Sequence, residues 1–165
     1  MPQKPLVSVI VPAYNVEPFL AETLASVQWQ TYREFEVIIV DDGSTDRTSE
    51  IVQQFVEKDA RFILLRQPNA NMAAARNAAL KQARGEWVAF LDADDAWLSE
   101  KLAAQLDLLE QAPRANLLFT DYFSWDGQND FGDPARNAVE RAADAHGFIA
   151  GDDADGNGQW LIPSA

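Results

Sequence analysis

Residues 7–15 read Val7-Ser8-Val9-Ile10-Val11-Pro12-Ala13-Tyr14-Asn15, a short β-branched run followed at once by turn-forming residues. The apolar positions are mostly consecutive rather than alternating, as in parallel strands that are buried on both faces. Proline has no amide hydrogen, so we expect the hydrogen-bond ladder to stop at Pro12. This stretch predicts a buried strand that opens directly into a loop.

Similar runs recur along the chain and alternate with helical patterns. The further predicted strands are Glu36–Val40, Phe62–Leu65, Trp87–Leu91 and a fifth at Leu117–Phe119. Helical spacing is seen at Leu20, Leu24 and Val27, at Ile51, Val52, Phe55 and Val56, in the alanine-rich Met72–Ala83, and at Leu98, Leu102, Leu106 and Leu109 before Pro113. Strand–helix alternation at this spacing predicts an α/β fold, Rossmann-like, with a mostly parallel sheet and helices on both faces.

The composition excludes several classes of protein. Among 165 residues there are 26 acidic and 13 basic side chains, one histidine and no cysteine. The lack of cysteine excludes disulfide scaffolds, Cys-ligated zinc and thiol catalysis. A formal charge of −13 without a basic cluster argues against nucleic acid or anionic lipid as a partner. No segment approaches 18 apolar residues, so we expect no transmembrane segment and a cytoplasmic protein.

The pattern changes after residue 125, which predicts two regions. Residues 1–125 form the α/β domain, and residues 126–165 form a loop-rich segment in which acidic residues greatly outnumber basic ones. Only Pro134–Ala145 has weak helical character there. The last residues, Gln159–Pro163, look like the start of another element, so we expect the fold to be incomplete at its C-terminus.

Acidic residues follow two of the predicted strands. In parallel sheets, ligands bind at the carboxyl ends of strands. Asp41 and Asp42 follow the second strand, and Asp92, Asp94 and Asp95 follow the fourth. Such clusters cost stability through mutual repulsion unless they serve a hydrogen-bond donor or a ligand. Mg²⁺ or Mn²⁺ would suit the second cluster, with phosphate oxygens completing the coordination shell.

The same residues also have purely structural interpretations. Ser44 or Thr45 would cap the second helix, while Gly43 supplies a permissive turn. Asp94 or Asp95 would cap the fourth helix, beginning near residue 97.

Single residues near the strand ends leave further alternatives open. Tyr14 would either pack in the turn or offer its ring and hydroxyl to a ligand. Arg76 would lie in solvent, pair with the strand-end acids, or bind a diphosphate. His146 is expected at the surface, and Trp97 would either pack or line a site.

Five motifs occur in an order that resembles family-2 glycosyltransferases. They are Val7–Asn15, Gln30-Thr31, Val40–Asp46, Ala75–Asn77 and Phe90–Asp95. Over roughly residues 5–125 the chain resembles the nucleotide-sugar-binding half of a GT-A fold. The resemblance implies an inverting, Mn²⁺- or Mg²⁺-dependent transfer of a sugar from a nucleotide-diphosphate donor to a carbohydrate or glycolipid acceptor. It also implies a part in cell-surface polysaccharide or glycolipid synthesis.

The resemblance implies a role for residues of the first and third motifs. Pro12, Ala13 and Tyr14 would line the nucleobase and ribose. Asp42 would accept a hydrogen bond from the base, with Asp41 beside it.

The last two motifs would hold the diphosphate. Arg76 would lie near its phosphates. Asp92, Ala93 and Asp94 match the family's D-x-D, which binds the ribose and the metal ion, and Asp95 would be a further metal ligand. A metal at this place would neutralise the charge that the leaving diphosphate develops.

Two features depart from the family pattern. Family members commonly have glycine after the third strand, where Asn71 can adopt left-handed backbone at modest cost. An inverting transferase also needs a carboxylate base for the acceptor hydroxyl. No counterpart is evident, and we expect the base beyond Ala165. Asp121, Asp152 and Asp153 are candidates by chemistry only.

Other functions remain as alternatives. The chain would be a truncated or catalytically inactive nucleotide-sugar-binding module, or a nucleotidyltransferase, which needs a similar sheet and metal. A nucleotidyltransferase is disfavoured because no glycine-rich basic loop follows the first strand, and a dehydrogenase because G-x-G-x-x-G is missing there. The inner face of the membrane is an alternative location, through parts outside this chain.

Overall fold

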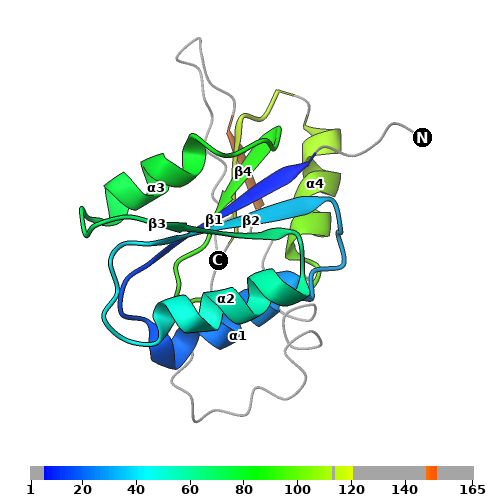
Figure 1. The fold of residues 1–165 in the computed structure, drawn as a ribbon. Coiled ribbons are helices and arrows are strands. Elements are labelled where there is room, and N and C mark those ends of the chain that lie inside the picture. The colour runs from blue at the N-terminus through cyan, green and yellow to red at the C-terminus, as the bar shows by residue number, and fades with distance from the viewer. Residues whose placement is uncertain (1–5, 113, 121–147, 152–165) are drawn as a thin grey trace, which may run out of the picture. The chain divides into compact units, whose positions relative to one another are not determined.

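The computed structural model describes residues 6–112, 114–120 and 148–151, in two compact units divided after Glu100 (Figure 1). The first unit contains the predicted motifs. None of the helices in the described ranges is both long and apolar enough to cross a membrane.

The first unit is a four-stranded parallel sheet with helices on both faces (Figure 1). Its strands are β1 (Val7–Ala13), β2 (Phe35–Asp41), β3 (Phe62–Arg66) and β4 (Trp87–Phe90), in the order β3-β2-β1-β4. The helices α1 (Glu17–Gln28) and α2 (Thr48–Lys58) cover one face, and α3 (Met72–Leu80) covers the other. The predicted α/β fold is confirmed.

The core against α3 follows from the alternation of side chains along each strand. Ile10, Ile38 and Val40 point to this face and pack against Ala75 and Ala79. All five residues are fully buried. Burying one such large apolar side chain stabilises the fold by about 1.5–3 kcal/mol. The small alanines let α3 lie close to the sheet, as its sequence predicts.

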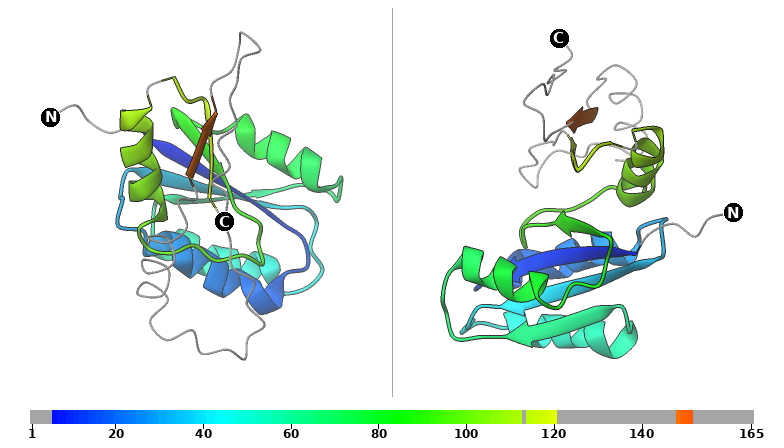
Figure 2. Two further views of the ribbon diagram at one scale, coloured as in Figure 1. Left: turned by 180° about the vertical axis from the view of Figure 1, so that it is seen from behind. Right: turned by 90° about the horizontal axis from the view of Figure 1, so that it is seen from above.

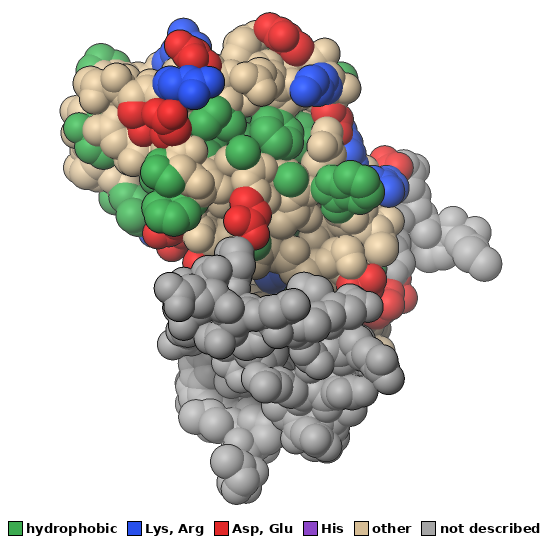
Figure 3. Space-filling view, turned by 90° about the horizontal axis from the view of Figure 1, so that it is seen from below, with side chains coloured by type: hydrophobic (Ala, Val, Ile, Leu, Met, Phe, Trp, Pro, Cys, Tyr) green, Lys and Arg blue, Asp and Glu red, His purple; other side chains and the backbone are tan. Residues whose placement is uncertain are grey.

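The opposite face is closed mainly by α1, whose Leu20, Leu24 and Val27 are fully buried. Figure 3 shows the outer surface of the molecule on the side of α1 and α2, where some apolar side chains lie near the middle and charged ones lie mainly around the margin. The spacing of these three residues therefore identified the buried side of the helix correctly.

The strand β1 continues through Pro12, so the prediction that the ladder stops there is wrong. Ala13 still pairs with β2, and its carbonyl accepts a hydrogen bond of 2.9 Å from the Asp42 amide. Ile10 accepts a hydrogen bond from the residue after β4, so it faces β4, and Pro12 faces the same side. Because β4 pairs only as far as Ile10, the missing amide hydrogen of Pro12 breaks no ladder bond.

The helix α2 begins too late in the sequence for the predicted capping by Ser44 or Thr45. Neither Ser44 nor Thr45 caps it, because its first residue is Thr48 and its N-cap is Arg47. The Thr48 amide instead donates to the Asp46 carboxylate at 2.9 Å.

Two other helix limits differ from the sequence prediction. The second unit opens with α4 (Lys101–Gln111), so Leu98 lies before the helix and neither Asp94 nor Asp95 caps it. The helix α3 ends at Leu80 rather than Ala83, although the Ala83 amide still bonds to the last turn.

The second unit also contains a two-stranded antiparallel sheet of β5 (Leu117–Thr120) and β6 (Phe148–Gly151) (Figure 2). The fifth strand is confirmed, but it pairs with β6 and not with the parallel sheet. The sequence did not predict β6 and placed Gly151 in a loop. The predicted boundary at residue 125, the weak helix at 134–145 and His146 lie outside the described residues.

A buried polar network ties together the amino ends of β1 and β2 and the loop before β4. The Glu36 carboxylate, in a residue only 2% exposed, accepts a hydrogen bond from the Ser8 hydroxyl at 2.6 Å and pairs with Arg84 at 2.6 Å. Burial alone would raise the Glu36 pKa, but these partners hold it below its ordinary value. A Cβ on Gly85 would lie 2.5 Å from the Ser8 nitrogen, so the close approach requires glycine.

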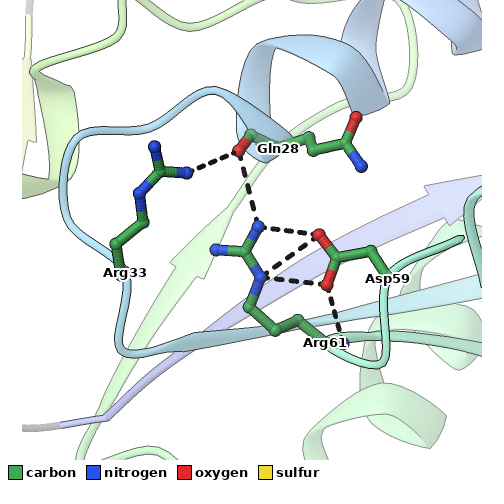
Figure 4. A network of polar contacts seen from close by, with 4 residues as sticks. All are labelled: Gln28, Arg33, Asp59 and Arg61. Carbon is green, nitrogen blue, oxygen red and sulfur yellow. Dashed lines mark hydrogen bonds and ion pairs between the residues drawn. The ribbon is translucent and has the colours of Figure 1, made fainter.

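A second network closes the carboxyl end of α1 (Figure 4). The last carbonyl of α1, on Gln28, accepts hydrogen bonds from the Arg33 and Arg61 guanidiniums, at 3.3 and 3.5 Å. Arg61 also pairs with Asp59 at 2.7 Å and lies over the Phe35 ring at 4.1 Å. Its hydrogen bonds lower the Asp59 pKa from 3.8 to about 2.

Replacing Asp59 with asparagine is expected to destabilise the protein in a pH-dependent way. The lowered pKa means that Asp59 stabilises the folded state above about pH 4, and that this contribution is lost as the pH falls towards 2. We expect Asp59→Asn to lower the free energy of unfolding at pH 7 by on the order of 1 kcal/mol. Urea denaturation at pH 7, 5 and 3 measures this. Glu57→Gln on α2 is the control, and a difference from the native protein that stayed constant with pH would contradict the assignment.

Candidate functional site

The loops that follow the four parallel strands lie at one edge of the sheet. Every described residue with a positive φ lies in these loops: Asn15 at 51°, Gly43 at 80° and Asn71 at 96°. Such angles are costly for residues with a Cβ and gather at functional sites. This edge is therefore the candidate site.

The loops after β1 and β2 hold each other through reciprocal hydrogen bonds. The Asn15 amide donates to the Ser44 hydroxyl at 3.1 Å, and the Thr45 amide donates to the Asn15 side-chain oxygen at 2.8 Å. Ser44 and Thr45 thus fix the neighbouring loop rather than cap a helix. Tyr14, next to this contact, has an exposed fraction of 49%, and its contact with a ligand stays a prediction.

The first turns of α1 and α2 are joined in the same way. The Glu17 amide donates to the Asp46 carboxylate at 3.1 Å, and the Arg47 amide donates to the Glu17 carboxylate at 3.2 Å. Burial works to raise the Asp46 pKa, but hydrogen bonds from Thr48 and Glu17 hold it below its ordinary value. The two helix starts therefore satisfy each other's free amides.

Asp42 joins the loop after β2 to the loop after β3. Its carboxylate accepts hydrogen bonds from the Gln67 side chain at 2.6 Å and from the amides of Ala70 and Asn71 at 3.0 and 2.9 Å. The residue is only 3% exposed. Burial would raise its pKa, but the three donors outweigh this and hold the pKa low. These hydrogen-bond donors thus offset the free-energy cost of burying Asp42 next to a second carboxylate, that of Asp41.

Asp41 is similarly enclosed, at 4% exposure. Its carboxylate accepts a hydrogen bond of 2.8 Å from the Ser44 amide and another from the Ser49 hydroxyl. The two acids are therefore part of the scaffold beneath the loops. A hydrogen bond from Asp42 to a nucleobase stays a prediction.

Asn71 occupies the strained position that the sequence assigned to it. Its backbone lies at φ 96° and ψ 161°, and its side chain caps α3 by accepting from the Ala74 amide at 3.0 Å. The expected positive φ at Asn71 is confirmed, but its ψ of 161° lies outside the left-handed helical region, so the conformation costs more than the sequence prediction assumed. The hydrogen bond from its amide to Asp42 helps to hold the strained conformation.

The acidic turn after β4, Asp92 to Asp95, presents carboxylates to solvent. Its backbone is closed by a 3.1 Å hydrogen bond from the Asp95 amide to the Asp92 carbonyl, and Ala93 is 4% exposed. Asp94 and Asp95 are exposed, and neither carboxylate has a donor or cation partner among the described residues. Burial, then the charges of Asp94 and Asp92, raises the Asp95 pKa.

Arg76 reaches this turn from α3. Its guanidinium pairs with the Asp92 carboxylate at 2.6 Å and lies 5.8 Å from the centre of the Phe90 ring. Its Nε atom is buried and lacks a hydrogen-bond partner within the described part of the chain. The pairing of Arg76 with a strand-end acid is therefore confirmed, and its contact with a diphosphate stays a prediction.

The donor set of the acidic turn fits a metal ion only with help from a ligand. Over residues 6–112, 114–120 and 148–151, no group of three or more His, Asp or Glu side chains is arranged to hold a metal. Mg²⁺ commonly takes one or two carboxylates and completes its shell with water and phosphate oxygens. The two unpaired carboxylates of Asp94 and Asp95 match that requirement.

The predicted site residues thus gather at one edge of the sheet, with different exposure. Pro12 and Ala13 are buried in β1, and of the three residues Pro12, Ala13 and Tyr14 only Tyr14 has an exposed side chain. The candidate bases Asp121, Asp152 and Asp153 lie outside the described residues. A separate groove of about 550 Å³ along α2 and β3 is lined by none of the predicted site residues.

The family model described as Glycosyl transferase family 2 matches residues 8–155. The chain belongs to this family.

Curated members of family 2 match most of the chain. The putative teichuronic acid biosynthesis glycosyltransferase TuaG of Bacillus subtilis is 45% identical over 120 residues, which cover 72% of this chain and 47% of TuaG. The UDP-Glc:alpha-D-GlcNAc-diphosphoundecaprenol beta-1,3-glucosyltransferase WfaP of Escherichia coli is 39% identical over 76% of this chain and 48% of its own length. The chain thus spans about half the length of these relatives.

Solved structures show that the fold is the GT-A fold. S. aureus TarS 1–349 in complex with UDP aligns with a TM-score of 0.67 and 34% identity, covering 74% of this chain and 37% of that chain. The mannosyltransferase PcManGT from Pyrobaculum calidifontis, in complex with GDP-Man and Mn²⁺, aligns with a TM-score of 0.66 and 31% identity over 74% of this chain and 37% of that chain.

Several residues of the site had no role in the sequence prediction. Asn15 and Gln67 fix the loops through side-chain hydrogen bonds, and Thr23 and Ser26 contact the acidic turn or the segment after it. Gln30 was noted only as part of a motif. One signal could have revealed the α1 residues: Thr23, Ser26 and Gln30 follow helical spacing beside the apolar stripe.

Substitutions of Asn71 are expected to separate its backbone role from its capping role. Asn71→Gly relieves the strained φ and loses the cap, so we expect it to be at least as stable as the native protein. Asn71→Ala keeps the strain and loses the cap, so the free energy of unfolding should fall by about 1–2 kcal/mol. Urea denaturation compares the three proteins. An alanine variant more stable than the glycine variant would show that the positive φ at position 71 does not destabilise the fold.

Proposed function

We propose that this chain is the donor-binding part of an inverting, metal-dependent glycosyltransferase. It would take a sugar from a nucleotide-diphosphate donor for transfer to a carbohydrate or glycolipid acceptor in cell-surface polysaccharide synthesis. The observation that carries the proposal is the acidic turn, in which Asp94 and Asp95 are exposed and have no cationic partner among the described residues, while Asp92 is paired with Arg76.

The loops after β1 and β2 would receive the nucleoside. Tyr14 offers an exposed ring and hydroxyl, positioned by the Asn15 contacts to the next loop. Pro12 and Ala13 would form the floor beneath it. Asp42 uses its carboxylate to hold the loop after β3, and one remaining lone pair would accept a hydrogen bond from the base.

The acidic turn would receive the diphosphate. Asp94 and Asp95 would hold Mn²⁺ or Mg²⁺ together with phosphate oxygens, and Asp92 would add the carboxylate oxygen that does not pair with Arg76. When bound, the metal would offset the negative charge that grows on the diphosphate as the bond to the sugar breaks. Arg76 would place its free N–H donors towards the phosphates while Asp92 keeps its side chain in position.

The names of the relatives support this class of donor. WfaP is named for UDP-Glc, TarS has been solved with UDP and with UDP-GlcNAc, and PcManGT with GDP-Man and Mn²⁺. We take UDP as the first probe and GDP as the second. An inverting reaction also requires a carboxylate base for the acceptor hydroxyl, which we assign to the acceptor-side part of the protein. We place the reaction in the cytoplasm, and fractionation of cells tests this location.

Metal dependence of nucleotide binding tests the proposal. Titration calorimetry should show UDP or GDP binding with Mn²⁺ that is strongly weakened by EDTA, because the carboxylates and the diphosphate then repel each other. Asp94→Asn should weaken binding in Mn²⁺ by about 10–100-fold, the size of effect usual for the surroundings of a metal. Asp152→Asn removes the same charge from the acidic segment and serves as the control.

Two outcomes of the calorimetry would contradict the proposal. Equal binding heats with Mn²⁺ and with EDTA would show that nucleotide binding does not involve a metal ion. Equal weakening by Asp94→Asn and Asp152→Asn would show that only the overall negative charge of the chain matters.

A further inference from the structure

Three polar residues follow one another at helical spacing along α1 and just beyond its end: Thr23, Ser26 and Gln30. Thr23 and Gln30 are 1% and 0% exposed, although the rest of the buried side of α1 is apolar. Burying polar groups costs free energy unless each has a hydrogen-bond partner. All three form hydrogen bonds with the segment 93–99, which begins inside the acidic turn: Thr23 and Gln30 donate to it, and Ser26 accepts from it.

Thr23 contacts the middle of the acidic turn. Its hydroxyl lies 2.8 Å from the Ala93 carbonyl and 3.4 Å from the Phe19 carbonyl of its own helix. A hydroxyl has a single hydrogen, so the shorter contact receives most of the donation. The Ala93 side chain is buried as well, at 4% exposure. The residue between Asp92 and Asp94 is thus fixed by both its side chain and its carbonyl.

The Ser26 hydroxyl donates within α1 and accepts a hydrogen bond from the segment 93–99. It donates to the Thr23 carbonyl at 2.7 Å, and its oxygen accepts from the Trp97 amide at 3.0 Å. Since the hydrogen is used within α1, a lone pair of the oxygen faces the segment.

Gln30 completes this arrangement just beyond the end of α1. Its amide nitrogen donates to the Leu98 carbonyl at 2.6 Å and to the Ser26 carbonyl at 3.2 Å. The Thr31 amide adds a hydrogen bond of 2.8 Å to the Ser99 carbonyl. The Gln30-Thr31 motif therefore joins the end of α1 to the segment after the acidic turn.

We propose that Thr23, Ser26 and Gln30 are positioning residues that hold the acidic turn in its metal-binding conformation before any ligand arrives. The inference rests on the proposed function and adds residues that do not touch the ligand. Residues 91–100 contain no helix or strand, so their backbone groups need other partners. The carboxylates of the turn also repel one another. Prior ordering by α1 spares the ligand the entropy of fixing the turn.

The variant Thr23→Val tests the contact that lies nearest to the carboxylates of the acidic turn. It keeps the shape of the side chain and removes the hydrogen bond to the Ala93 carbonyl. We expect UDP binding in Mn²⁺ to weaken on the order of tenfold, as for other residues that orient metal ligands. UDP binding in EDTA should change less than twofold. In the ligand-free chain, the Asp95 amide, which donates to the Asp92 carbonyl at 3.1 Å, should exchange its hydrogen faster. Thr23→Ser, which keeps the hydroxyl, should restore binding and protection.

A destabilised control separates positioning from general stability. Val52→Ala truncates a fully buried side chain of α2 that forms no hydrogen bond to the segment 93–99. It should lower the unfolding midpoint while leaving the ratio of the dissociation constants in Mn²⁺ and EDTA as in the native chain. If Thr23→Val does not fold, Gln30→Leu is measured in its place, with the same expectation.

The outcomes distinguish this inference from the proposed function. A native chain whose UDP binding ignores Mn²⁺ overturns both. A native chain that responds to Mn²⁺, together with a Thr23→Val variant of native affinity and native amide exchange, overturns the positioning role alone. Equal loss of metal-dependent binding in Val52→Ala also overturns it, because any loss of stability would then suffice.

Discussion

The candidate site depends on one buried carboxylate, that of Asp42, which accepts three hydrogen bonds from the loop after β3. An ionised group at 3% exposure is tolerated only because each donor is in place. The same contacts hold Asn71 in a backbone conformation that an isolated chain would avoid. Removing the charge would release two loops together, so the geometry of this part of the candidate site is set by a residue buried beneath the surface.

The other loops at this edge are also held by hydrogen bonds or ion pairs, although the residues that form them differ. Asn15 ties the loop after β1 to the loop after β2, Thr23 holds the turn after β4 from α1, and Arg76 approaches the same turn from α3. The four loops are thus held from below by neutral or paired groups, while Asp94 and Asp95 are exposed and have no partner in the part of the chain that the structure describes. This contrast separates the part of the edge that maintains structure from the part that offers charge to a ligand.

The sequence predicted the strands, the helix faces and the place of the acids because these depend on local periodicity and on the rule for strand ends. It failed where distant partners decide. Pro12 remains in the ladder because β4 has already ended, and Ser44 contacts Asn15, 29 positions away, instead of capping α2. The strand β6 pairs with β5 across a long separation in sequence. Thr23 likewise finds its partner 70 positions away.

The buried Ser8–Glu36–Arg84 network lies at the amino ends of the strands, opposite the candidate site. A strand of seven residues such as β1 separates the two ends by roughly 20 Å. One end of the sheet therefore secures the register while the other carries the candidate site. In evolutionary terms, such a layout lets the loops of the candidate site diverge while selection on folding acts on different residues. A change in what the loops bind then need not compromise the pairing of the strands.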